Sequence, residues 1–361
     1  MSMRPECPYF GSCGGCSLQH ISYENQIANK GRSVEHLTAQ QNIQIFASPP
    51  YKYRNRMDFI FEDNHVGLRN KKGGIVNIDC CPIMVDELNL LLKEISKFSF
   101  SDPYFSPKKS GTLKKAILRK ADNSAILFVL DASSSRIAGT IEEITKFASV
   151  SSADNIVVAL EETAGVLEPY AMIKGNPYLQ STLMNKVFQF PAIGFFQNNL
   201  YLADKMHQYC HKLLLSHETK NAQLLDVFAG VGTFGLLNAE LFKTVTLIEE
   251  NKISSEYAKI NAQGLSHVHV ECRDAHSLHK VVCTHPLYII VDPPRSGMDQ
   301  KTIETINKLQ PKSIIYISCN PLQLKKDLLK FKSYQIKNAA LFDFFPETQH
   351  AEVVVELIPK P

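Results

Sequence analysis

The 361-residue chain has no apolar run approaching the roughly 20 residues that a membrane-spanning helix needs. Its first residues also lack the apolar core of a secretory signal peptide, so we expect a cytoplasmic protein. Its nine cysteines are then expected to be reduced. They are better interpreted as metal ligands, a nucleophile or core residues than as disulfides.

A strong charge of either sign is also absent. The net charge of +3 is too small to indicate a nucleic-acid partner by itself. Basic residues nevertheless gather in two segments, which comprise Lys52, Arg54, Arg56, Arg69, Lys71 and Lys72, and then Lys108, Lys109, Lys114, Lys115, Arg119 and Lys120. Such clusters often only solvate a surface, but they also suit contact with phosphates.

The chain contains no internal repeat or low-complexity tract, and its pattern changes once, near residue 190. Before that point, short β-like runs such as 57–61 and 125–130 alternate with turns, and helices are expected at 23–39 and 85–98. After it, a helix at 198–215 precedes strands at 224–228, 245–249, 288–292 and 314–318, with helices at 252–263 and 322–329. We therefore predict a β-rich α+β domain at 1–190 and a Rossmann-like, doubly wound parallel α/β domain at 191–361.

A glycine-rich loop follows the first strand of the predicted α/β domain. Gly230 and Gly232 would let the backbone turn tightly beside a ligand, and Glu249 ends the next strand, where an acid typically binds ribose hydroxyls. The glycines alone would also fit a dehydrogenase. The run Asp292-Pro293-Pro294 at a later strand end is instead typical of S-adenosylmethionine methyltransferases that act on nucleobases.

Cys319 follows the apolar run 313–317, at the edge of the sheet where α/β enzymes hold their reactive groups. A thiolate can activate carbon 5 of a pyrimidine by attacking carbon 6, after which a base must remove the carbon 5 proton. Glu347, His350 and Glu352 lie downstream, and spacing does not choose among them. Methylation of an exocyclic amine would need no such cysteine.

Four motifs together resemble the RNA uracil-5-methyltransferase family: the loop 226–232, the run 292–297, the run 318–321 and the Phe-Pro-x-Thr-x-His-x-Glu run that ends at Glu352. The resemblance implies that Cys319 is the nucleophile and Glu352 the general base. It also assigns S-adenosylmethionine binding to Gln197, Phe228, Glu249, Asp292, Gly230 and Gly232, and more loosely to Asp274.

Cys7, Cys13 and Cys16 have a C-x5-C-x2-C spacing, and a fourth ligand must come from Cys80 or Cys81. Spacing alone leaves zinc and an iron–sulfur cluster equally open. Relatives in the family carry a [4Fe–4S] cluster whose last ligand precedes a proline, which points to Cys81. Because the polar mechanism needs no electron, we expect the cluster to have a structural or RNA-positioning role.

Many members of the family begin with a small β-barrel RNA-binding module, whereas this chain reaches Cys7 at once. We therefore expect RNA contacts from the β-rich domain, at 53–57 and 108–120. The short form resembles 23S rRNA enzymes, with a tRNA T-loop uridine as the alternative target, and we expect a monomer. Two competing hypotheses are amino-group methylation led by Asp292 and a non-catalytic, cluster-bearing RNA-binding protein.

Overall fold

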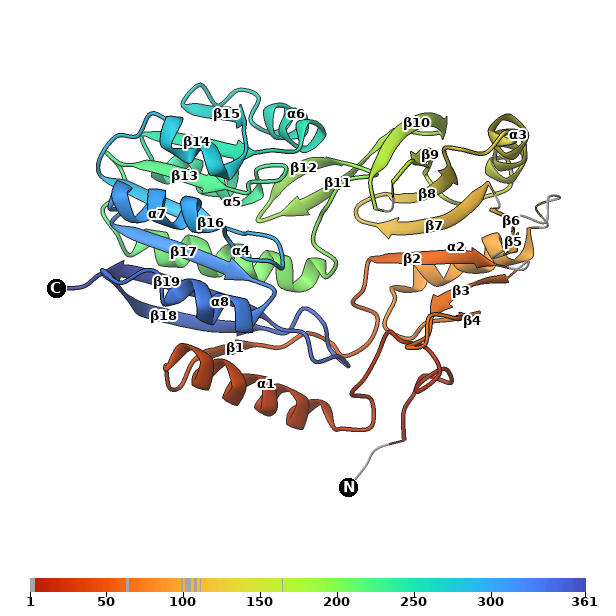
Figure 1. The fold of residues 1–361 in the computed structure, drawn as a ribbon, viewed down its shortest axis with the longest axis horizontal. Coiled ribbons are helices and arrows are strands. Elements are labelled where there is room, and N and C mark those ends of the chain that lie inside the picture. Colours follow the sequence, from red (N-terminus) through yellow and green to blue (C-terminus); the bar gives the residue numbers. More distant parts are fainter. Residues whose placement is uncertain are drawn as a thin grey trace. The chain divides into compact units, whose positions relative to one another are not determined.

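The computed structural model describes residues 4–62, 65–98, 100, 105–106, 109–110, 112–163 and 165–361. The chain divides into two compact units (Figure 1). Unit 1 comprises Met1–Tyr23, Pro49–Ser181 and Pro191–Leu200, and unit 2 comprises Glu24–Ser48, Thr182–Phe190 and Tyr201–Pro361. In the part of the chain that the structure describes, none of the helices combines the length and apolarity needed to cross a membrane.

This division differs from the single boundary expected near residue 190. Glu24–Ser48 belongs to unit 2, where strand β1 (Gln44–Phe46) pairs in parallel with β18 (Tyr334–Phe342). Pro191–Leu200 belongs to unit 1, where the buried Arg119 guanidinium donates hydrogen bonds to the carbonyl groups of Ala192 and Gly194. Each unit is thus built from chain segments that lie far apart in the sequence.

Unit 1 contains a seven-stranded sheet in the order β10-β9-β8-β7-β2-β3-β4. Its strands are β2 (Arg56–Glu62), β3 (His65–Arg69), β4 (Ile75–Asn77), β7 (Leu113–Lys120), β8 (Ser124–Asp131), β9 (Asn155–Glu161) and β10 (Leu167–Lys174). The β8–β9 pair is parallel and the other pairs are antiparallel. A separate two-stranded sheet joins β5 (Phe105–Ser106) and β6 (Lys109–Ser110).

Two helices share one hydrophobic core with this sheet: α2 (Asp86–Lys97) and α3 (Ile137–Ala148). The leucines of α2 recur at helical spacing, so that Leu88, Leu91 and Leu92 are all buried. Alternate residues of the strands pack in the same core. Among them is Phe128 of β8, whose ring lies edge-on to Phe147 of α3 with the ring centroids 5.7 Å apart.

Unit 2 is built on an eight-stranded sheet in the order β1-β18-β19-β17-β16-β13-β14-β15. Its other strands are β13 (Gln223–Val227), β14 (Thr244–Glu249), β15 (Val268–Cys272), β16 (Leu287–Val291), β17 (Ser313–Ser318) and β19 (Glu352–Pro359). Its helices are α1 (Tyr23–Thr38), α4 (Leu200–Leu215), α5 (Thr233–Leu237), η1 (Ala239–Leu241), α6 (Lys252–Asn261), η2 (Ala275–Lys280), α7 (Gln300–Leu309) and α8 (Pro321–Leu328). The hairpin of β11 (Tyr178–Leu183) and β12 (Lys186–Pro191) has residues in both units.

The Rossmann-like prediction is confirmed for β13 to β17, which are parallel to their neighbours in this group. The sheet is nevertheless mixed, because β19 runs antiparallel to both β17 and β18. In Figure 1, α7 and α8 lie in front of this sheet and α4 lies behind it. The strand order reverses direction between β13 and β16, so a topological switch point, where α/β folds bind ligands, lies there.

Candidate active site

The carboxyl ends of β13, β14, β16 and β17 meet at one edge of the unit 2 sheet. β13 leads into the loop 228–232, and Glu249 is the last residue of β14. Asp292 directly follows β16, and Cys319 directly follows β17. The structure therefore brings together most of the residues that the sequence motifs single out.

The loop after β13 has an unusual backbone. Phe228, Gly230 and Gly232 all have positive φ, at 64°, 56° and 87°. For a bulky residue such as Phe228 this conformation is a genuine outlier, and such outliers concentrate at functional sites. At Gly232 a side chain is excluded, because a Cβ atom would stand 2.8 Å from Cδ1 of Leu247. At Gly230 the corresponding position is open, so a ligand can approach this backbone.

Glu249 stabilises the same loop through hydrogen bonds. Its carboxylate accepts hydrogen bonds from the Gly230 N–H and the Asn251 N–H, both at 2.8 Å. Burial raises the pKa of Glu249, and these two hydrogen bonds oppose that rise. Each carboxylate oxygen still has a lone pair for a ligand hydroxyl. Glu249 can thus shape the loop and bind a ribose at once.

Two further acids lie deep at this edge of the sheet. Asp226 is fully buried on β13 and accepts a 2.7 Å hydrogen bond from the Gly235 N–H, and burial raises its pKa to about 8. Burial likewise raises the pKa of Asp292 to about 7. Both groups therefore titrate near neutral pH, as groups at functional sites often do.

The strand register sets Cys319 beside Glu352. Ser318, at the end of β17, pairs with Val353 near the start of the antiparallel β19, so the next opposed residues are Cys319 and Glu352. Burial, together with the nearby Glu352 and Asp292 carboxyl groups, raises the pKa of Cys319 to about 11. Burial also raises the pKa of Glu352 well above its ordinary value. The thiol, this carboxyl group and Asp292 therefore form one electrostatic cluster.

Arg295 is a member of this cluster that the residue assignments above do not include. Its guanidinium lowers the pKa of both Cys319 and Glu352 and hydrogen-bonds to the thiol. Its carbonyl oxygen accepts a 3.0 Å hydrogen bond from the side chain of Asn320. The loop after β16 is thereby tied to the loop that carries Cys319. The only sequence signal for Arg295 was its place directly after Asp292-Pro293-Pro294.

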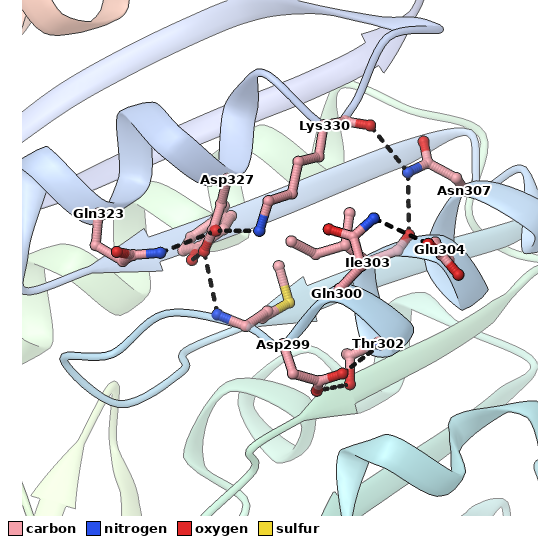
Figure 2. Close-up of polar contacts among 11 residues, drawn as sticks. Asp299, Gln300, Thr302, Ile303, Glu304, Asn307, Gln323, Asp327 and Lys330 are labelled. Atoms are coloured by element: carbon pink, nitrogen blue, oxygen red, sulfur yellow. Dashed lines mark hydrogen bonds and ion pairs between the residues drawn. The ribbon is translucent and has the colours of Figure 1, made fainter.

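A buried carboxylate on α8 links β17 to the loop after β16. Asp327 accepts hydrogen bonds from the Tyr316 hydroxyl on β17 (2.8 Å) and from the Met298 N–H in the loop after β16 (3.1 Å). Figure 2 shows Gln323 and Lys330 directed to the same carboxylate. At Gly297 a Cβ atom would collide with it, so only glycine allows this close approach.

The predicted cofactor contacts of two residues are not tested by the structure. Gln197 lies in unit 1, where its carbonyl oxygen accepts a 3.1 Å hydrogen bond from the Asn55 side chain, so its role in unit 2 stays a prediction. Asp274 is exposed just beyond β15, and its carboxylate accepts a 2.8 Å hydrogen bond from the His276 N–H at the start of η2. Its adenine contact also stays a prediction.

Five cysteines of unit 1 line one cavity of about 480 Å³: Cys7, Cys13, Cys16, Cys80 and Cys81. Burial raises the pKa of Cys16 to about 12, and the nearby thiols of Cys81, Cys7 and Cys13 contribute to that rise. Burial also raises the pKa of Cys80, but Asp79 is its main charged neighbour. Cys7 acts on both Cys80 and Cys81, so the choice of Cys81 as the fourth ligand stays a prediction.

The described residues contain no group of three or more ligating side chains close enough together for a single metal ion. A four-iron cluster binds each thiolate at a different iron atom, so it needs thiolates spread around a cavity rather than converging on one point. Backbone contacts hold two of these cysteines: the Cys7 N–H donates to Gln19, and the Cys81 N–H donates to Asn89 of α2. Which group the cysteine cavity holds therefore stays a prediction.

Several basic residues proposed as RNA contacts have other partners. Arg119 is buried, which rules it out as a surface contact. Lys115 forms a 2.7 Å ion pair with Glu161, and Arg56 pairs with Asp58. Within 53–57 the basic side chains of Arg54 and Arg56 line the cysteine cavity. Lys108 lies outside the described residues.

Comparison with known proteins agrees with this site. The family model described as tRNA (Uracil-5-)-methyltransferase matches residues 276–360, which include Asp292, Cys319 and Glu352. An uncharacterized RNA methyltransferase from Clostridium tetani is 30% identical over 98% of this chain and 83% of the relative. Another from Caldanaerobacter subterraneus is 29% identical over 96% of this chain and 83% of the relative.

Among solved structures, the fold matches a tRNA (uracil-54, C5)-methyltransferase from Pyrococcus abyssi in complex with S-adenosyl-L-homocysteine. The TM-score is 0.79 at 23% identity, over 96% of this chain and 86% of that chain. At this identity the match establishes the fold alone. Together with the relatives and the matched family model, the motifs and their placement lead to one conclusion: the chain belongs to the RNA uracil-5-methyltransferase family.

Proposed function

We propose that this enzyme transfers a methyl group from S-adenosylmethionine to carbon 5 of a uridine in RNA, through a covalent adduct between Cys319 and carbon 6. The observation that carries the proposal is the strand register, in which Cys319 and Glu352 are the next opposed residues of β17 and β19. A nucleophile and a base side by side match the two roles that this chemistry requires.

The chain's own residues would act in sequence. The Cys319 thiolate bonds to carbon 6 of the uracil, and the π electrons between carbons 5 and 6 move toward the carbonyl oxygen on carbon 4, so that the resulting enolate makes carbon 5 nucleophilic. After carbon 5 gains the methyl group, Glu352 accepts the carbon 5 proton. The carbon–sulfur bond then breaks, which restores the ring double bond and frees the thiolate. The target base must leave its stack to reach Cys319.

The loop 228–232 fits S-adenosylmethionine, which supplies the methyl group when bound. The open space beside Gly230 admits a ligand close to the backbone, and Glu249 has acceptor capacity for ribose hydroxyls. The S-adenosyl-L-homocysteine bound to the Pyrococcus abyssi neighbour supports this assignment. We further propose that Gln197, Phe228, Asp274 and Asp292 contact this cofactor.

In unit 1 we propose a [4Fe–4S] cluster held by Cys7, Cys13, Cys16 and Cys81. The shared cavity and the mutual influence of these four thiols support it. Nothing in the transfer chemistry needs an electron, so its role would be to hold the N-terminal segment in place. The side chains of Arg54 and Arg69 line the same cavity and could contact RNA phosphates nearby.

For the RNA target we propose 23S rRNA. A tRNA uridine is the second candidate, supported by the description of the matched family model and by the substrate that the Pyrococcus abyssi neighbour's name gives. Mapping 5-methyluridine by mass spectrometry in both RNAs from a deletion strain distinguishes them, because only the true target loses the modification.

The chemistry is tested with purified protein, S-adenosylmethionine and RNA from the deletion strain. Wild type should form 5-methyluridine, Cys319→Ala should form none, and the exposed Cys272→Ala should match wild type. A Cys319→Ala protein that still forms 5-methyluridine at the normal rate would eliminate the adduct mechanism. Methylation of an exocyclic amine would favour the amino-group alternative, and absence of S-adenosylmethionine binding in calorimetry would favour a non-catalytic RNA-binding protein.

A further inference from the structure

The loop 343–351 connects β18 to β19 and therefore precedes Glu352, the first residue of β19. It has no helix or strand of its own, yet Asp343, Glu347 and Thr348 within it are buried. The position of the Glu352 carboxyl group therefore depends on the conformation of this loop. The contacts that hold the loop are therefore relevant to the proposed proton transfer.

Gln26 of α1 binds Glu347 through two hydrogen bonds. Its side-chain nitrogen donates to Oε2 of Glu347, and its side-chain oxygen accepts from the Glu347 N–H, both at 3.0 Å. Gln26 is 1% exposed and Glu347 is 3% exposed, so water does not compete with these bonds. Glu347 also has a φ of 65°, which a residue other than glycine adopts only when its surroundings hold it there.

Lys30 binds the same loop one helical turn later, and residues four apart share one face of a helix. Its ammonium group pairs with the Asp343 carboxylate at 2.5 Å and donates to the carbonyl oxygen of Phe345 at 3.1 Å. Lys30 and Asp343 are both buried, and the Glu347 carboxylate also acts on Lys30. One face of α1 therefore contacts the loop at three successive points.

The remainder of the loop is folded by its own side chains. The Thr348 hydroxyl donates to the carbonyl oxygen of Phe345 at 2.8 Å and accepts from the His350 N–H at 3.2 Å. The residues between Glu347 and Glu352 therefore form a short segment with its own hydrogen bonds, which connects the α1 contacts to Glu352. Glu347, which the sequence left open as a candidate base, is engaged with α1, whereas Glu352 influences Cys319.

We propose that Gln26 and Lys30 are positioning residues that place the general base Glu352 by fixing the loop 343–351. The inference rests on the proposed function, since it concerns one step of that reaction. Cys319 directly follows β17 and does not belong to this loop, so loss of the Gln26 contacts leaves the nucleophile in place. Displacement of Glu352 slows the later step, in which the carbon 5 proton leaves and the carbon–sulfur bond breaks.

The test measures formation and release of the covalent protein–RNA adduct on denaturing gels, with RNA from the deletion strain and S-adenosylmethionine. Glu352→Gln is the reference for a lost base and should trap the adduct. Gln26→Leu should form the adduct no more slowly than wild type and release it more slowly, by about tenfold to a hundredfold for a displaced catalytic group. Asn25→Leu, an exposed amide on the same helix, should match wild type.

A wild-type release rate in Gln26→Leu, while Glu352→Gln traps the adduct, would overturn the positioning role and leave the proposed function intact. Absence of any adduct in Glu352→Gln would overturn both. If Gln26→Leu does not fold, as judged by circular dichroism, Gln26→Asn takes its place, because its amide is one methylene too short to keep both bonds. Loss of adduct formation and release together in a folded Gln26→Asn protein would also contradict the proposal.

Discussion

The Tyr316 hydroxyl offers a direct test of the buried network around Asp327. It donates a 2.8 Å hydrogen bond to the fully buried Asp327 carboxylate, which also holds the Met298 N–H. Tyr316→Phe removes this bond and leaves the ring volume unchanged. A hydrogen bond to a charged group contributes about 1.5–3 kcal/mol, so we expect the free energy of unfolding to fall by about 2 kcal/mol.

Tyr334→Phe is the matched control, because the Tyr334 hydroxyl is also buried but donates to a neutral acceptor, the carbonyl oxygen of Pro311, at 3.0 Å. A bond of that kind contributes about 1 kcal/mol. Urea unfolding followed by far-ultraviolet circular dichroism suits this chain, which contains no tryptophan. Equal losses in the two variants, or a larger loss in Tyr334→Phe, would refute the charge-assisted network.

Three further predictions concern titration and metal binding. Alkylation of Cys319 by iodoacetamide should shift to lower pH in Glu352→Gln, because the substitution removes a carboxyl group that raises the thiol's pKa of about 11; an unchanged midpoint would contradict their proximity. The pKa of Asp226 is about 8 in the folded protein and near 4 in the unfolded chain. Burial of Asp226 therefore lowers the free energy of unfolding by an amount that grows as the pH rises from about 4 to about 8. The gain in urea midpoint from Asp226→Asn should therefore be larger at pH 8 than at pH 5, and an equal gain would refute this. Cys81→Ser should lose bound iron and sulfide after anaerobic purification whereas Cys80→Ser keeps them, and the reverse pattern would reassign the fourth ligand.

Local patterns predicted the parallel core of unit 2 well. The strand predicted at 314–318 is β17 (Ser313–Ser318), and the helix predicted at 322–329 is α8 (Pro321–Leu328). Apolar runs bounded by polar or proline residues are typical of buried strands, and Pro321 marks a helix start. Because parallel strands end at one edge, these assignments were enough to predict that the motif residues lie together there.

Features that depend on distant partners could not be predicted in this way. Gln44 pairs with Ala340, and no local pattern reveals that Glu24–Ser48 belongs to the C-terminal unit. The choice of Glu352 over Glu347 as the candidate base likewise depends on tertiary contacts, because the hydrogen bond between Gln26 and Glu347 is visible only in the structure.

The central claim is that Cys319 and Glu352 act on the same uracil. The most direct measurement is mass spectrometry of the peptide containing Cys319 after Glu352→Gln has reacted with S-adenosylmethionine and target RNA and been digested with protease and nuclease. We predict a peptide whose added mass equals a methylated uridine nucleotide, located on Cys319. An unmodified Cys319 peptide in protein that has nevertheless methylated the RNA would contradict the account.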